Sequence, residues 1–204
     1  HVRGASQAMF RSYAGARMAE IISNLLPLGP ESGFSPHRDV SRVYGAVYAM
    51  QGADFVSVVQ GNFNLAAIEQ AAQARAATPS GAPIVVTQYA GRRIYTVANL
   101  GFVPLTQHTV LSGNETGMRR ALDKLRSGQL QASLRPWMHE LLANDAAPYV
   151  VVGDVGGQAV VAAAAQQVPF LNELTMVRVL GNFAEPGMKV DGSLTARTAA
   201  SAAA

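Results

Sequence analysis

The sequence predicts an α+β fold, with antiparallel or mixed β-sheet and helices packed on one face. Extended segments come in consecutive pairs joined by short turns, which is typical of antiparallel hairpins. Helical segments fall between groups of strands instead of alternating with each strand, which argues against a doubly wound parallel sheet. The chain has 204 residues, of which 49% are hydrophobic, so it can bury a sizeable core. Each half of such a fold could take a ferredoxin-like arrangement.

The first predicted elements are a helix and a hairpin. Apolar residues recur at three- and four-residue steps over Val2–Leu26, which predicts an amphipathic helix. The alternating segments Arg42–Ala49 and Ala53–Gln60 predict two strands joined at a tight turn. Asn64 is placed to cap a helix that runs to about residue 76.

The middle of the chain predicts further strands. The segments Pro83–Tyr89 and Arg92–Ala98 flank Ala90-Gly91, a two-residue connection that suits a hairpin turn. Val103–Leu111 reads as one more strand, and Pro104 near its start favours an edge position.

Two helices are expected next. Ser112 and Glu115 have the spacing of a capping box, which predicts that Ser112 begins a helix ending before Gly128. Leu134–Leu142 carries apolar residues on one side and predicts a second helix.

The last part of the chain predicts strands around one helix. Tyr149–Asp154 is a continuous apolar run, which indicates an interior strand, and Asp154 is placed to cap a helix over Gly156–Gln167. Leu174–Ala184 and Met188–Ala196 predict a hairpin, and the final alanine-rich residues resemble the first turns of a truncated helix.

We expect one compact unit over residues 1–204, with two related halves, about 34–128 and 134–204, as the alternative. The helix 2–26 would then lie beside them. The triplets Gly61-Asn62-Phe63 and Gly181-Asn182-Phe183 favour related halves. Three matching residues also arise by chance, so both interpretations stay open.

Composition excludes several functional classes. The absence of cysteine removes thiolate nucleophiles and cysteine metal sites, and it fits an exported protein as well as many cytosolic ones. The net charge is +3, but the arginines are scattered, with pairs only at Arg92-Arg93 and Arg119-Arg120. A nucleic-acid partner is therefore not expected. No apolar run approaches the roughly 20 residues of a membrane-spanning helix.

The histidines do not predict a metal or catalytic site. His139-Glu140 begins like the zinc motif HExxH, but Ala143 stands where the second histidine is needed. His108 has no nucleophile or orienting acid nearby in the sequence, and the other two histidines are His1 and His37. We therefore expect no metal ligands and no catalytic histidine.

A cofactor is not expected either. The turn Gly153–Gly157 follows an apolar strand, yet Val155 fills the position that a dinucleotide fingerprint keeps for glycine. Four aspartates near strand ends could in principle supply an acid–base pair, but none is singled out: Asp39, Asp54, Asp145 and Asp154. Four strand tyrosines could line a pocket, although cross-strand packing is the favoured interpretation: Tyr44, Tyr48, Tyr89 and Tyr95.

A resemblance rests on the order of several segments: DVSRVY, ADFVSVVQGNFN with AAIEQA, YAGRRIYTV, and TVLSGNETGMRRALDKL. This order, over Asp39–Leu125, resembles cell-envelope proteins of unknown function from Gram-negative bacteria, often predicted lipoproteins. Asn64 replaces the aspartate of their pattern, and Ser112-Gly113 alters the last strand exit. The resemblance implies an exported protein, periplasmic or anchored to the outer membrane, and transfers no catalytic residue.

These observations predict a non-catalytic cell-envelope domain that binds a partner protein or a small apolar ligand. The alternative is a hydrolase-type enzyme whose site is assembled from separated polar residues. A third option is a structural module that forms homo-oligomers through the helix Val2–Leu26. An exposed apolar patch would favour association, whereas a pocket with convergent acids or a histidine would favour an enzyme.

Overall fold

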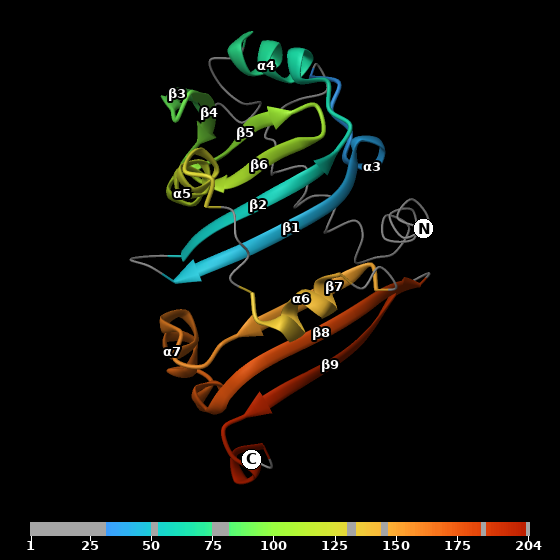
Figure 1. Ribbon diagram of the computed structural model, residues 1–204, viewed down its shortest axis with the longest axis vertical. Coiled ribbons are helices and arrows are strands. Elements are labelled where there is room, and N and C mark those ends of the chain that lie inside the picture. The colour runs from blue at the N-terminus through green and yellow to red at the C-terminus, as the bar shows by residue number, and fades with distance from the viewer. Residues whose placement is uncertain are drawn as a thin grey trace.

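Two antiparallel sheets, each built from one continuous part of the chain, form the framework of the protein (Figure 1). They are seen in a computed structural model that describes residues 32–49, 53–74, 82–129, 134–143, 147–184 and 187–202. The α+β class and the antiparallel pairing are as predicted. The helix predicted over Val2–Leu26 lies outside the described residues.

The first sheet has six strands in the order β1-β2-β6-β5-β4-β3. Both predicted hairpins are confirmed, since β1 pairs with β2 and β3 pairs with β4 in antiparallel register. Ala90 and Gly91 form the second turn with positive φ angles of 49° and 75°. The strands are β1 (Val40–Ala49), β2 (Ala53–Gly61), β3 (Val85–Tyr89), β4 (Arg92–Val97), β5 (Leu100–Thr106) and β6 (Thr109–Asn114).

The prediction of a single strand over Val103–Leu111 was wrong. The chain reverses at Gln107-His108, between β5 and β6. This turn contains neither glycine nor proline, so the strand pattern runs through it without a visible break. Pro104 is buried in an interior strand instead of an edge, where a register shift between Pro104 and Thr106 interrupts the ladder and accommodates its missing N–H.

Helices cover both faces of this sheet, which corrects the expectation that they would share one face. Ile68 and Ala72 of α4 (Leu65–Ala74) pack with Phe102 and its neighbours in one core cluster. Met118 and Leu122 of α5 (Glu115–Arg126) pack in the other cluster. Successive residues of one strand point to opposite faces, so adjacent pairs divide between the clusters: Tyr95 and Ile94, Phe102 and Val103, Val110 and Leu111.

The cap of α5 lies two residues later than predicted. Ser112 belongs to β6, where its buried hydroxyl donates to the carbonyl oxygen of Gly101 at 3.0 Å. Asn114 is the N-cap, and its side-chain oxygen accepts from the N–H of Gly117 at 3.1 Å. The predicted cap of α4 is confirmed, because the Asn64 side chain accepts from Ala67 at 3.1 Å.

The second sheet has three strands in the order β7-β8-β9. Its strands are β7 (Tyr149–Asp154), β8 (Leu174–Ala184) and β9 (Gly187–Ala196), and the predicted β8–β9 hairpin is confirmed. The expectation that Tyr149–Asp154 is an interior strand was wrong, because β7 lies at an edge. Its apolar residues are half-buried or exposed, and within the described ranges it pairs with β8 on one side only.

Short helices accompany the second sheet. Helix α6 (Pro136–Leu142) contacts β7, and α7 (Ala159–Ala165) contacts the 3₁₀ helix η2 (Pro169–Glu173). The N-cap of α7 is Gln158, not Asp154. Asp154 ends β7 and forms an ion pair with Arg135 at 2.6 Å instead. Two four-residue helices complete the described elements: α3 (Pro36–Asp39) and α8 (Ala199–Ala202).

Neither sheet follows the β-α-β-β-α-β order of a ferredoxin-like unit. In the first sheet the four strands β3 to β6 follow one another as a meander, and β6 then pairs with β2. The second sheet has one helical excursion, between β7 and β8, followed by a hairpin. Among the described residues, no helix is both long and apolar enough to cross a membrane.

Candidate functional site

A cavity of about 260 Å³ lies where β1 begins and α4 begins. The position follows from the first hairpin, since Val40 at the start of β1 is paired with Gly61 at the end of β2. A Cβ at Gly61 would overlap the carbonyl oxygen of Asp39, so only glycine permits this close approach. The cavity is lined by Ser32, Gly33, Phe34, Arg38, Asp39, Asn62, Phe63, Asn64 and Ile68.

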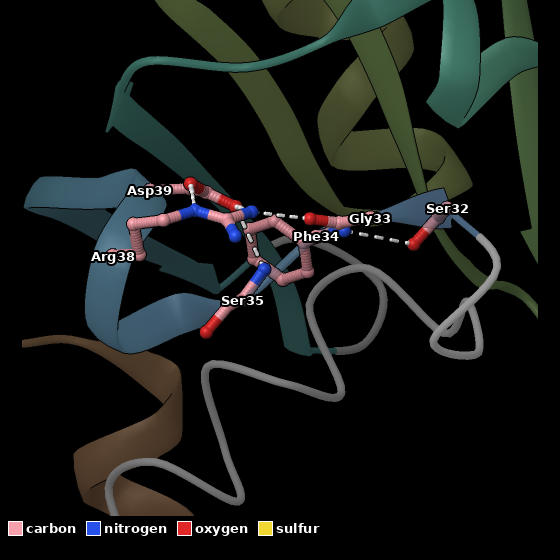
Figure 2. A network of polar contacts seen from close by, with 6 residues as sticks. All are labelled: Ser32, Gly33, Phe34, Ser35, Arg38 and Asp39. Atoms are coloured by element: carbon pink, nitrogen blue, oxygen red, sulfur yellow. Dashed lines mark hydrogen bonds and ion pairs between the residues drawn. The ribbon is translucent and has the colours of Figure 1, made fainter.

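An ion pair between neighbouring residues dominates the polar wall of this cavity. Nε of Arg38 donates to Oδ1 of Asp39 at 2.6 Å, and its terminal nitrogen donates to Oδ2 at 2.8 Å. The N–H of Ser35 also donates to Oδ2, at 2.7 Å, which holds the α3 turn closed. The hydrogen bond to Asp39 and its charge raise the pKa of Arg38 above its ordinary value. Both carboxylate oxygens are therefore engaged (Figure 2).

The remaining wall is aromatic and helical. The rings of Phe34 and Phe63 lie 6.2 Å apart between centroids. The first turn of α4 is capped by Asn64 of the same chain. The lining contains no histidine, and its single carboxylate is held by Arg38. This cavity can hold a small polar molecule, but its residues do not form a nucleophile with a base.

The described histidines stand apart from one another. His108 lies exposed in the β5–β6 turn, not in mid-strand as predicted, and its Nδ1 is 3.0 Å from the carbonyl oxygen of Gly61. His139 lies exposed on α6, as the amphipathic pattern predicted. His1 and the side chain of His37 lie outside the described residues. Within the described ranges, no three acidic or histidine residues form a group that could hold a metal ion.

The predicted aspartates do not converge. Asp39 precedes β1, whereas Asp54 is the second residue of β2 and lies at the opposite end of the same hairpin, since Tyr48 is its register partner. Asp54 is buried and accepts from the side-chain amide of Asn114 at 3.0 Å. Asp154 belongs to the second sheet, and Asp145 lies outside the described residues. The three described aspartates thus serve three separate structural contacts.

The strand tyrosines also separate, as the packing interpretation expects. Tyr95 is buried and stacks on Phe102, with ring centroids 5.1 Å apart. The hydroxyl of Tyr89 donates to Asp123 at 2.8 Å. Tyr44 is 41% exposed on β1, and the side chain of Tyr48 lies outside the described residues.

A second hollow, of about 500 Å³, lies along the exposed side of α5. Four cationic side chains contribute to its lining: Arg119, Arg120, Lys124 and Arg126. The three arginines have acidic partners nearby, namely Glu115, Asp54 and Asp123 respectively. These ion pairs reduce the positive potential that a bound anion would meet.

The second sheet carries a partly exposed apolar face. Residues opposite each other in antiparallel register point to the same face. Val151 is opposite Val179, Val179 is opposite Gly192, and Val177 is opposite Leu194. We call this the open face and define it by Tyr149, Val151, Val177, Val179, Val190 and Leu194.

Side-chain exposure shows that the open face is accessible. Val190 is 59% exposed, Leu194 is 55% exposed and Val151 is 38% exposed. The other side of β9 is polar and carries Lys189, Asp191, Ser193 and Thr195. The sequence predicts a strand over Met188–Ala196, but it does not connect the apolar positions of this strand to those of β7. The signal lay in the alternation of β9, and only the register shows that the apolar residues of all three strands share one side.

The fold defines an α+β protein with two antiparallel sheets. No protein-family model matches the chain, and no curated protein sequence matches it. Its fold is similar to three crystal structures of TP0453. Crystal form III has a TM-score of 0.55 and 14% identity, covering 95% of this chain and 71% of that chain. Crystal form I also has a TM-score of 0.55 and 14% identity, and the match covers 86% of this chain and 69% of that chain. Crystal form IV has the same TM-score and identity, and the match covers 95% of this chain and 73% of that chain.

Proposed function

We propose that the protein is a non-catalytic cell-envelope domain that binds a partner protein through the open face of its second sheet. The observation that carries the proposal is the exposure of Val151, Val190 and Leu194 on one face. Single exposed apolar residues are ordinary, but a contiguous group drawn from separate strands is typical of an interaction surface. Water released from these side chains would supply the free energy of binding.

The shape of the surface favours a protein over a small apolar ligand. Small-molecule sites are concave and bury about 70–90% of the ligand. The open face belongs to a sheet of only three strands, and the two described cavities have other linings. A partner that lays its own apolar surface across the three strands would cover Val190 and Leu194 more completely.

Two features support an exported location. The segments between Asp39 and Leu125 resemble those of predicted lipoproteins, and the chain contains no cysteine. Fractionation of the native host tests this part of the proposal. Recovery with the periplasm or the outer membrane is expected, and recovery with the cytoplasm contradicts it.

Site-specific photocrosslinking in the native host tests the binding surface. A photoreactive residue at Leu194 or Val151 should give a discrete adduct with a partner of defined mass. Arg178 on β8 offers a matched control, because it is exposed and is opposite Ser193 in register, on the polar side of the same sheet. Equal adducts at Leu194 and Arg178, or no adduct at Leu194, would contradict the proposal.

A further inference from the structure

Among the described residues, one side of the β9 backbone pairs with no other strand. β9 forms an edge of the second sheet, and Figure 1 shows it along the outer border, with the short helix α8 near its end. β9 has ten residues and contains no proline, and its register with β8 is regular from Thr195 to Gly187. Natural proteins commonly protect such edges with proline, bulges or charges, because a free edge can pair with another strand.

The edge strand β9 carries one charge of each sign, so it can be complementary to a second copy of the same strand. Lys189 and Asp191 lie two residues apart, so both point to the polar side of β9, with Val190 between them on the open face. Neither charge forms an ion pair with the described residues. When a strand pairs with its own copy in antiparallel orientation about a central residue, the residues that flank that centre face one another.

We propose that β9 pairs antiparallel with β9 of a second copy of this chain, with Val190 opposite Val190 of the partner subunit. Lys189 then faces Asp191 of the partner subunit, and the two-fold axis repeats this pair. Each dimer therefore gains two opposite-charge pairs and one valine pair, which are the cross-strand contacts that stabilise antiparallel sheets.

The other long edge does not offer the same complementarity. β1 also has ten residues, but its register shifts between Val40 and Arg42. Its one ionisable charge is that of Arg42, with no acid in the strand. Self-pairing of β1 would therefore gain no ion pair, which leaves β9 as the edge suited to a second copy.

Dimerisation rests on the proposed function and extends it, because it would enlarge the binding face. The strands β7, β8 and β9 have 6, 11 and 10 residues. With strands spaced about 4.8 Å apart and about 3.3 Å per residue, they present a face of about 430 Å². A standard interface covers about 800 Å² on each partner. Two sheets joined at β9 present about 860 Å² of continuous face, which is comparable to that standard.

Light scattering after size exclusion of the full chain tests the pairing. The wild type should be a dimer, whereas Lys189→Glu or Asp191→Lys should weaken dimerisation by about tenfold or more, since each places like charges opposite one another twice. The double variant Lys189→Glu/Asp191→Lys should restore the dimer. Lys124→Glu makes the same charge change on the exposed side of α5 and should leave the dimer intact.

A second measurement checks the register. The chain has no cysteine, so Val190→Cys should form a disulfide-linked dimer, because directly paired strand residues approach within the Cα separation that a disulfide requires. Val47→Cys on β1, also highly exposed, is the control and should stay monomeric in non-reducing gels. A monomeric wild type, or a dimer that the charge reversals do not change, overturns the inference.

The two proposals fail separately. Photocrosslinking at Leu194 to a different protein would persist if dimerisation fails, so the loss of the dimer alone rejects only the β9 pairing. Conversely, a β9 dimer that gives no adduct from Leu194 to another protein rejects the partner-binding function.

Discussion

Asn114 links the beginning of β2 to the beginning of α5 through the buried carboxylate of Asp54. Its side-chain nitrogen donates to Oδ1 of Asp54 at 3.0 Å. Its side-chain oxygen accepts from the backbone N–H of Gly117 at 3.1 Å and from that of Phe55 at 3.2 Å. One amide therefore caps a helix, closes the end of a strand and provides a donor to a buried charge.

Replacing Asn114 should be costly for this reason. Asn114→Ala removes a helix cap and leaves Asp54 without its amide donor, so the free energy of unfolding should fall by about 2–4 kcal/mol in urea titrations. Asn64→Ala is the matched control, because it removes only the exposed cap of α4 and should cost about 1 kcal/mol. Equal losses for the two variants would show that the contact with Asp54 contributes nothing.

Helix propensity predicts that Gly117→Ala stabilises the protein, but the packing around Gly117 predicts that it destabilises it. Alanine is favoured over glycine in a helix by about 1 kcal/mol. A Cβ at Gly117, however, would overlap the carbonyl oxygen of Phe55, where α5 approaches β2. Gly117→Ala should therefore destabilise the protein by about 1–3 kcal/mol in the same titrations. A stabilised variant would mean that α5 can move away from β2 at little cost.

Tyr89 should make the stability depend on alkaline pH. Its hydrogen bond to Asp123, together with burial, raises the pKa of Tyr89 above its ordinary value of 10.0. A phenol whose pKa is raised by folding stabilises the native state below pH 10.0, and this contribution is lost as the pH rises through the native pKa. The stability difference between wild type and Tyr89→Phe should therefore shrink above pH 10.0.

Phenolate absorbance provides the companion measurement for Tyr89. The difference between the titration curves of the wild type and Tyr89→Phe should have its midpoint above 10.0, and Asp123→Ala should bring that midpoint down. An unchanged midpoint in Asp123→Ala would assign the shift to burial, not to the hydrogen bond.

Local patterns in the sequence predicted the hairpins and most helices because turn residues and apolar periodicity mark them directly. Ala90-Gly91 and the β8–β9 pair are examples. The same patterns failed where a side chain acts over a long distance in sequence. Ser112 has the spacing of a cap, but the sheet uses it as a buried strand residue. Asp154 also resembles a cap, but Arg135 binds it.

The open face, likewise, could be predicted from the sequence only in part. Alternation within Gly187–Ala196 predicts a strand with one apolar side and one polar side. It does not reveal which strand lies beside it, whether that side is covered, or whether the strand forms an edge. The register with Val177 and Val179 and the exposed fractions of Val190 and Leu194 supply this information.

By itself the sequence determined the α+β class, the paired strands, the cap at Asn64 and the end of α5 before Gly128, because these depend on backbone conformations set within a few residues. Only the tertiary structure decided that helices cover both faces of the first sheet, that β7 and β9 are edges, and that three strands share an open apolar face. These properties arise from pairing between residues far apart in the chain, so no local pattern specifies them. Charged residues make up only 14% of the chain, and only the strand pairing shows where they lie.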